Sequence, residues 1–162
     1  MQLEHHEIIN PKHNKEISLI LEHLQSPENI GLILRTAEAM GVQKVVIISD
    51  NFRQISPRIK RTTRSAENNL NITFVNSWEE AVNHFEKNTT HFYALEKTSK
   101  SVDYTTFEHH FPCVVVCGNE KNGVSEKALE KCTDHLHINM YGKNTSLNVA
   151  IATGILLSKI VS

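Results

Sequence analysis

The sequence is poor in the features that mark several classes of protein. It has three cysteines and no Cys-x-x-Cys pair, which argues against a disulfide framework and favours a reducing compartment. Its charges nearly cancel to a net −1 with histidine neutral, so no global field steers it to nucleic acid. The longest apolar stretch, residues 146–161, is interrupted by Asn148 and Lys159, which excludes a membrane span. Any nucleic-acid binding must come from a local patch.

Other absences narrow the domain organisation and the chemistry. The polar start, MQLEHH, is not typical of a signal peptide, and we see no internal repeat or low-complexity segment. The ten histidines have no matching Cys or His pair at zinc-finger spacing, so we predict no metal. A chain of 162 residues is normally one domain. We therefore predict one domain over residues 1–162, with residues 1–15 loose, in a cytoplasmic protein.

The rest of the sequence alternates strand-like and helical segments. Apolar runs predict strands at residues 16–24, 44–49, 72–75, 91–95, 111–117 and 135–138. Start signals and spacing predict helices at residues 26–40, 78–87, 125–132 and 146–160. Residues 50–71 show no apolar periodicity, and residues 97–110 form a polar connection. This alternation predicts an α/β fold, a mostly parallel sheet with helices on both faces.

Two loops in the last third of the chain predict a ligand site. The run Val114–Val116 stops at Gly118-Asn119-Glu120, and the strand at 135–138 leads into Tyr141-Gly142-Lys143-Asn144. Ligands of open α/β sheets bind beyond the carboxyl ends of the strands. The first loop lacks the Gly-Lys-Ser/Thr ending of a Walker loop, so the pattern is not that of a nucleoside triphosphatase.

The two loops carry a resemblance to a known family. GNEKNGVS (residues 118–125) and INMYGKNTSLNVAIATGI (residues 138–155) resemble the second and third motifs of the SpoU branch of the SPOUT superfamily. These enzymes are RNA ribose 2'-O-methyltransferases that use S-adenosylmethionine. Asn29, Gly31 and Arg35 fit the first motif. The resemblance covers residues 17–162 and implies a C-terminal deep trefoil knot, the SPOUT or α/β knot, whose loops form the cofactor site.

One position departs from the family pattern. Asn139 stands where the family usually has proline. Because proline fixes φ and has no N–H, Asn139 alters the rigidity or the hydrogen bonds of that loop.

The resemblance also implies a set of site residues. The catalytic residues would be Arg35, Asn29, Glu120, Ser146 and Asn148. The cofactor-binding residues would be Leu95, Gly118, Asn119, Ile138, Met140, Ser146 and Leu147.

Plainer roles stand beside three of these residues. Arg35 is effectively always protonated, which favours a role in fixing an RNA phosphate and stabilising the developing alkoxide over a role as the base, since a base would require an unusual environment. Without the motifs it would be a solvated arginine. Glu120 would orient Asn29 or Arg35, or tie down its loop by accepting backbone N–H groups, and the two roles are compatible. Ser146 would also serve as the N-cap of the last helix.

Two surface features predict partners. Residues 53–64 carry several basic side chains and no acid. We favour phosphate contact over a solvated face; the predicted contacts are Arg58, Lys60, Arg61 and Arg64. The last helix has apolar residues on more faces than one small domain covers, which predicts a homodimer through the C-terminal region, as in the family.

The sequence therefore predicts an S-adenosylmethionine-dependent RNA 2'-O-ribose methyltransferase. Its first motif looks most like that of the transfer-RNA guanosine enzymes. The alternatives are a ribosomal RNA substrate, methylation of a base nitrogen, and a non-catalytic RNA-binding or assembly factor that keeps the cofactor pocket.

Overall fold

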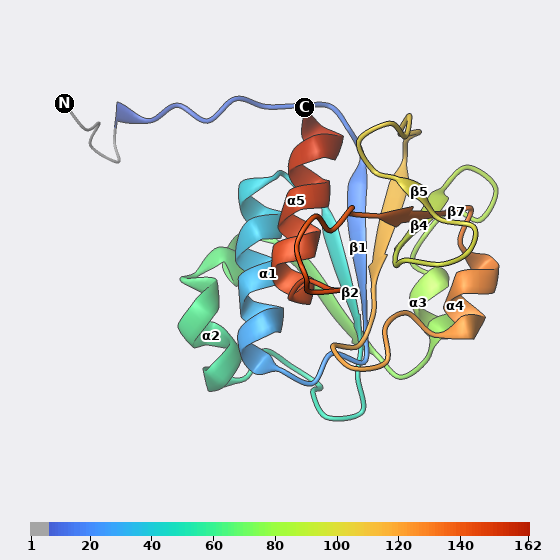
Figure 1. Ribbon diagram of the computed structural model, residues 1–162. Helices are drawn as coiled ribbons and strands as arrows, with labels where there is room; N and C mark the ends of the chain where they lie inside the picture. Colours follow the sequence, from blue (N-terminus) through green and yellow to red (C-terminus); the bar gives the residue numbers. More distant parts are fainter. Residues whose placement is uncertain (1–6) are drawn as a thin grey trace.

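A computed structural model describes residues 7–162 and contains one seven-stranded sheet (Figure 1). The strands are β1 (Ile17–Glu22), β2 (Lys44–Ile48), β3 (Asn71–Val75), β4 (His91–Leu95), β5 (Val102–Asp103), β6 (Cys113–Cys117) and β7 (Asp134–His137). Their order across the sheet is β3-β2-β1-β6-β4-β7-β5, and every pairing between neighbours is parallel. The predicted α/β class with a parallel sheet is confirmed.

Helices cover both faces of the sheet. They are α1 (Pro27–Ala39), α2 (Pro57–Thr63), α3 (Trp78–Val82), α4 (Glu126–Lys131) and α5 (Val149–Val161). Figure 1 shows α1, α2 and α5 on one side and α3 and α4 on the other. Leu19 and Val115 point to the first side, whereas Val114 and Val116 pack with Trp78 and Ala128 on the second. The strands read as continuous apolar runs because both faces are covered.

The segment at 50–71, which shows no apolar periodicity in the sequence, contains α2 and a short 3-10 helix, Ala66–Asn69. Ser56 caps α2 by accepting from the Ile59 N–H, and Pro57 begins the helix. Helix α2 has seven residues, and only Ile59 and Thr63 of them are buried. Two buried positions are too few to show a helical period in the sequence. A Cβ at Gly31 of α1 would lie 2.6 Å from the Ile59 carbonyl oxygen, so the two helices are in close backbone contact.

Other predicted boundaries also need correction. Helix α3 ends at Val82 rather than residue 87, β1 is shorter than residues 16–24, and β5 lies within the connection at 97–110. Helix α5 begins at Val149 rather than at Ser146, because Asn148 is the N-cap. Its Oδ1 accepts from the N–H groups of Ala150 (2.8 Å) and Ile151 (3.3 Å). Ser146 is therefore an exposed loop residue and not the cap.

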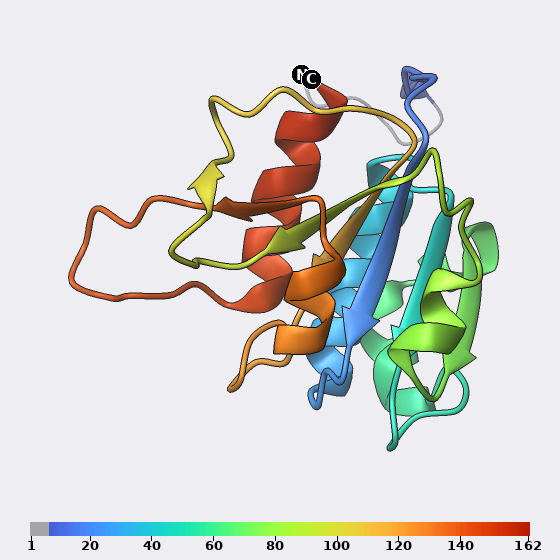
Figure 2. The same cartoon turned by 90° about the vertical axis from the view of Figure 1, so that its right-hand side faces the viewer.

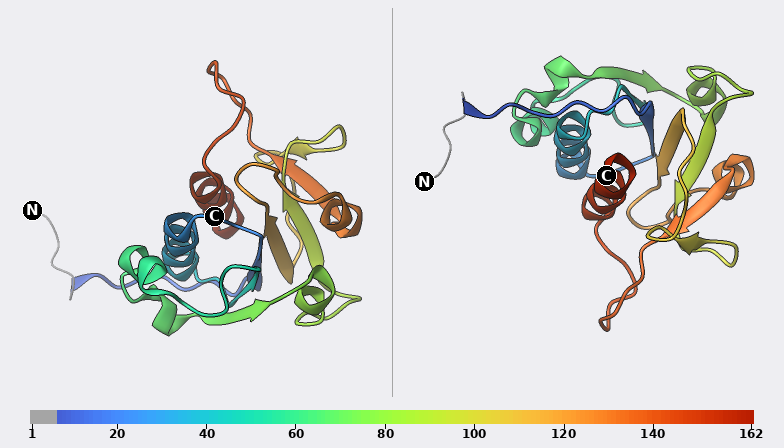
Figure 3. Two further views of the ribbon diagram at one scale, coloured as in Figure 1. Left: turned by 90° about the horizontal axis from the view of Figure 1, so that it is seen from below. Right: turned by 90° about the horizontal axis from the view of Figure 1, so that it is seen from above.

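The connection from β7 to α5 runs well outside the layers of the fold, and Figures 2 and 3 show it projecting as a long loop. Of the segment expected to be loose, residues 1–6 lie outside the described chain. His13 and Lys15 of the same segment hydrogen bond to the carbonyl oxygens of Met40 and Ile160, so this part is fastened to α1 and α5. The knot stays a prediction.

None of the helices within residues 7–162 has the length and apolar character needed to cross a bilayer.

Candidate functional site

A cavity of about 560 Å³ opens beyond the C-terminal ends of β4, β6 and β7. Parallel strands end at one edge of a sheet, so the residues that follow them meet there. The predicted cofactor residues all line this cavity, namely Leu95, Gly118, Asn119, Ile138, Met140, Ser146 and Leu147. Asn29, Glu120 and Asn148 line it as well. Four of the five predicted catalytic residues therefore lie at the cavity.

Asn119 shapes the loop that follows β6. Its Nδ2 donates to the His23 carbonyl oxygen at 2.7 Å, and its Oδ1 accepts from the N–H groups of Lys121 and Asn122. A Cβ at Gly118 would lie 2.2 Å from the backbone of Gly123, so the loop folds tightly on itself. Gly118 is thus required by the backbone of its own loop, in addition to any room that it leaves for a ligand.

Glu120 joins this loop to the start of α1. Its carboxylate accepts from the N–H groups of Gln25 (2.9 Å) and Ser26 (3.0 Å) and from the Asn29 side chain (3.1 Å). Both expected contacts, with backbone N–H groups and with Asn29, are present. Partial burial raises the pKa of the Glu120 carboxyl, but the hydrogen bonds from Gln25, Asn29 and Ser26 together outweigh it, so the pKa lies below its ordinary value.

Asn29 stands at the centre of the site. It is buried in the first turn of α1, where Ser26 Oγ caps the helix by accepting its N–H. Its side chain donates to Glu120, and its Oδ1 accepts from Asn148 Nδ2 at 2.9 Å. Glu120, Asn29 and Asn148 form one hydrogen-bonded chain across the cavity mouth. The three sequence motifs therefore meet in space.

Arg35 lies apart from this group. It is six residues beyond Asn29 on α1, which places it about 120° away around the helix axis. It lies one turn after Gly31 on α1. A Cβ at Gly31 would contact Thr62 of α2, so Arg35 is on the side of α1 that faces α2. The side chain is exposed and does not line the cavity of its own chain. Its catalytic role stays a prediction.

The predicted phosphate contacts lie on and beside α2. Arg58, Lys60, Arg61 and Arg64 are all exposed. Arg58 Nη2 lies 3.5 Å from the Glu28 carboxylate of α1, so its charge is partly offset. Arg64 ends α2 in a left-handed conformation with φ 49°. Phosphate binding by these side chains stays a prediction.

Two carboxylates that the sequence analysis missed also hold the loop after β6. Glu96, at the end of β4, accepts from the Val124 N–H at 3.0 Å and lines the cavity. Glu22, the buried last residue of β1, accepts from the N–H (2.9 Å) and the hydroxyl (2.6 Å) of Ser125, which caps α4. In the sequence, the available signal for both residues was an acidic residue at the end of an apolar strand.

Asn139, which departs from the family pattern, makes two contacts with its side-chain amide. Its Nδ2 donates to Asp103 of β5, and its Oδ1 lies 3.2 Å from Nε2 of His137 on β7. A proline at this position could make neither bond, so Asn139 ties the cavity loop to the edge strand.

Comparison with known proteins places the chain in a family. The sequence profile of the SpoU rRNA Methylase family matches residues 16–158. The chain belongs to the SpoU methylase family. An uncharacterized tRNA/rRNA methyltransferase of Synechocystis sp. is 33% identical over 150 residues, which are 91% of this chain and 54% of that protein. The 23S rRNA (guanosine-2'-O-)-methyltransferase RlmB of Yersinia pestis is 28% identical over 145 residues, 88% of this chain and 58% of RlmB.

The fold agrees with this family assignment. The structure of an AdoMet-bound rRNA methyltransferase from Sinorhizobium meliloti superposes with a TM-score of 0.80 at 28% identity, over 93% of this chain and 57% of that one. The sheet and its helices are thus those of SpoU methyltransferases. The chain spans about half the length of the curated relatives that it matches.

Proposed function

We propose that this chain transfers a methyl group from S-adenosylmethionine to a ribose 2'-hydroxyl of RNA, preferentially at a guanosine of transfer RNA. The observation that carries the proposal is the hydrogen-bonded chain of Glu120, Asn29 and Asn148 at the mouth of the cavity. Family membership and the activity of RlmB, a 23S rRNA guanosine 2'-O-methyltransferase, support the 2'-O chemistry at a guanosine.

The cavity suits S-adenosylmethionine. Its volume of about 560 Å³ lies within the range of small-molecule pockets, about 300–1,000 Å³. Leu95, Ile138 and Leu147 provide apolar surface for an adenine, and the glycine-containing loop at 118–123 provides backbone beside it. The AdoMet-bound relative with 28% identity supports the same cofactor here. When bound, it supplies an electrophilic methyl group, and no metal is needed for the transfer.

The polar residues at the mouth would position the acceptor. Methyl transfer requires the hydroxyl to be held in line and near contact with the methyl group. The ionised Glu120 fixes the amide of Asn29, and Asn29 in turn fixes Asn148, so these groups are preorganised. Ser146, which is exposed beside them, adds a hydroxyl. Arg35 would supply the positive charge that fixes an RNA phosphate and stabilises the developing alkoxide.

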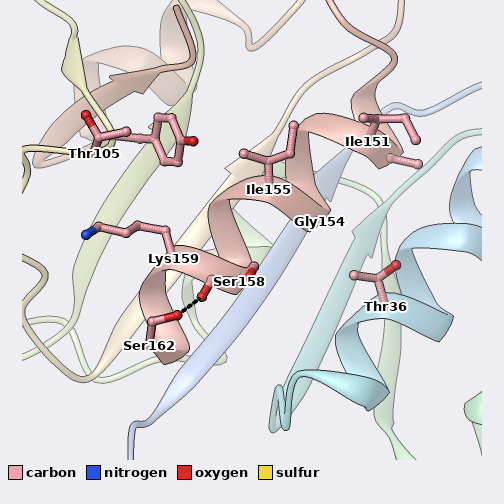
Figure 4. Close-up of a pocket in the computed structure, with 10 residues that line it drawn as sticks. Thr36, Thr105, Ile151, Gly154, Ile155, Ser158, Lys159 and Ser162 are labelled. Carbon is pink, nitrogen blue, oxygen red and sulfur yellow. Dashed lines mark hydrogen bonds between the residues drawn. The ribbon is translucent and has the colours of Figure 1, made fainter.

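A second copy of the chain would cover the outer face of α5. A groove of about 640 Å³ runs along this helix, lined by Thr36, Ile151, Gly154 and Ile155 (Figure 4). Ile151 is 55% exposed, and Leu32 on the neighbouring helix α1 is 41% exposed. Apolar side chains gathered in this way are typical of an interface. We propose a homodimer through this face and a cytoplasmic location, where transfer RNA is modified.

The test is to map 2'-O-methylated nucleotides in RNA from cells with and without the protein, and to digest the RNA to nucleosides. Complementation with wild type should restore one 2'-O-methylguanosine in a transfer RNA, and Asn29→Ala should not restore it. Glu130→Gln, on the exposed side of α4, is the matched control.

Other results of the same experiment would contradict parts of the proposal. Loss of a ribosomal site would favour the ribosomal alternative, and a methylated base would exclude ribose chemistry. Unchanged methylation in every cellular RNA, together with S-adenosylmethionine binding, would favour the assembly factor.

A further inference from the structure

Glu96 is an acidic residue inside the cavity to which no role in the reaction has yet been given. It follows directly after β4, so its carboxylate lies at the edge of the sheet, next to Leu95 and near Gly118. Among the described residues, Glu96 and Glu120 are the two acids that line this cavity. They differ in how many of their acceptor sites the protein itself occupies.

A carboxylate has about four acceptor sites on its two oxygens. Glu120 uses three of them for Gln25, Ser26 and Asn29, all at the start of α1. Glu96 Oε1 accepts from the Lys97 N–H and Oε2 from the Val124 N–H, each at 3.0 Å. Each Glu96 oxygen therefore retains an acceptor site, which suits a ligand with two adjacent hydroxyl donors.

The loop after β6 also holds the Glu96 carboxylate in place. Gly123 adopts φ 71°, and a Cβ there would lie 2.2 Å from Glu96 Oε2. The carboxylate therefore packs against a position that only glycine leaves open. With the Val124 N–H on the same oxygen, its orientation is set before any ligand arrives. A preorganised acceptor loses little entropy on binding.

We propose that Glu96 binds the two ribose hydroxyls of the adenosine part of the cofactor; this inference rests on the cofactor of the proposed function. Adjacent 2'- and 3'-hydroxyls donate in nearly one direction, which matches the two oxygens of one carboxylate. Acidic side chains that follow strands accept from ribose hydroxyls in other α/β nucleotide-binding folds. Hydrogen bonds to an ionised acceptor are about twice as strong as neutral ones.

The test measures binding, with no need for an RNA substrate. Calorimetry would compare S-adenosylhomocysteine with its 2'-deoxy and 3'-deoxy analogues on wild type, Glu96→Gln and the control Glu130→Gln. We expect wild type and the control to lose about tenfold to a hundredfold in affinity for each missing hydroxyl, as for a hydrogen bond to a charged group. Glu96→Gln retains one oxygen for the Val124 N–H. It should bind S-adenosylhomocysteine more weakly and discriminate little among the three ligands.

Two results would overturn this inference while leaving the proposed function intact. If wild type binds all three ligands equally, Glu96 does not bind the ribose hydroxyls. A Glu96→Gln variant that weakens all three ligands by the same factor shows that Glu96 acts only through the loop. Folded wild type that fails to bind S-adenosylhomocysteine would contradict the cofactor itself and thus both proposals. If Glu96→Gln does not fold, Glu96→Asp, with a shorter carboxylate, takes its place in the same comparison.

Discussion

The side-chain amide of Asn148 donates a 2.9 Å hydrogen bond to the side-chain oxygen of Asn29, 119 residues earlier in the chain. This bond joins the N-termini of α1 and α5, and Glu120 accepts from the other end of the Asn29 amide. A substitution at any one of these three residues should therefore affect the other two.

Asn148 has two separable tasks, the cap of α5 and the contact with Asn29. Asn148→Ala should lower the free energy of unfolding by about 1 kcal/mol, the usual effect of losing an N-cap. Asn148→Asp keeps an acceptor for Ala150 and Ile151 but has no N–H for Asn29, so it should keep most of the stability and lose methyl transfer. Urea unfolding beside single-turnover kinetics measures both effects. Full activity of Asn148→Asp would show that the bond to Asn29 is dispensable.

Glu120 should make stability depend on pH in the acid range. Its pKa in the folded chain lies below the ordinary 4.5, so the ionised carboxylate stabilises the fold above that pH. The contribution is lost as the pH falls through the lowered folded-state pKa. The stability difference between wild type and Glu120→Gln should be full near neutrality and shrink on acidification below pH 4.5. Denaturant unfolding across pH, with Glu130→Gln as control, checks it; a difference that grows on acidification would reverse the assignment.

Arg35 should separate cofactor binding from chemistry, because it lies outside the cavity of its own chain. Arg35→Ala should leave S-adenosylmethionine affinity nearly unchanged while lowering the rate of methyl transfer about 10²–10³-fold, as for other donors to developing negative charge. Arg35→Lys keeps the charge without the planar guanidinium and should recover little. Calorimetry beside single-turnover assays measures both. Wild-type turnover in Arg35→Ala would make it a surface residue, and catalysis would have to be sought at Glu120, Ser146 and Asn148.

The basic residues of α2 should contact RNA phosphates. Neutralising Arg58, Lys60, Arg61 and Arg64 together should weaken RNA binding and flatten its log–log salt dependence by about 0.7–0.9 per lost contact. Because Glu28 offsets Arg58, Glu28→Gln should instead strengthen binding. Lys127→Gln with Lys131→Gln, on α4 across the sheet, is the control in the same binding titrations. If the salt slope does not change, these basic side chains face solvent and do not contact phosphate.

The groove along α5 should hold a second copy of the chain. Ile151→Asp places a charge on a side chain that is 55% exposed, and it should shift the protein from dimer to monomer without unfolding it. Ile9→Asp changes a side chain that is 91% exposed, away from this groove, and should leave the dimer intact. Sedimentation at micromolar concentration distinguishes the two states. Wild type that sediments as a monomer would exclude the dimer.

The sequence predicted the parts of the fold that local chemistry determines. The central runs of β1, β2 and β6 are apolar because both faces of the sheet are covered. Ser26 and Pro27 predicted the start of α1, whereas the same pair at Ser56 and Pro57 was missed because α2 is too short to show a period.

Tertiary contacts determined the remainder. Ser146 and Asn148 are both good N-cap residues, and Asn148, the cap in the structure, also contacts Asn29 on a distant part of the chain. Glu22 and Glu96 hold the loop after β6 only because β1 and β4 flank β6 in the sheet. No local pattern contains that neighbourhood, so their contacts could not be predicted from the sequence.

The position of β1 also has a consequence for synthesis on the ribosome. β1 lies between β2 and β6, and Leu19 pairs with Val115, so this strand lacks its second neighbour until residues 113–117 emerge. Pairing of parallel strands far apart in sequence is intrinsically slow, because the long loop must close first. The nascent chain therefore carries an open, apolar strand edge while residues 49–112 are synthesised, and chaperones that shield such edges would act in this interval.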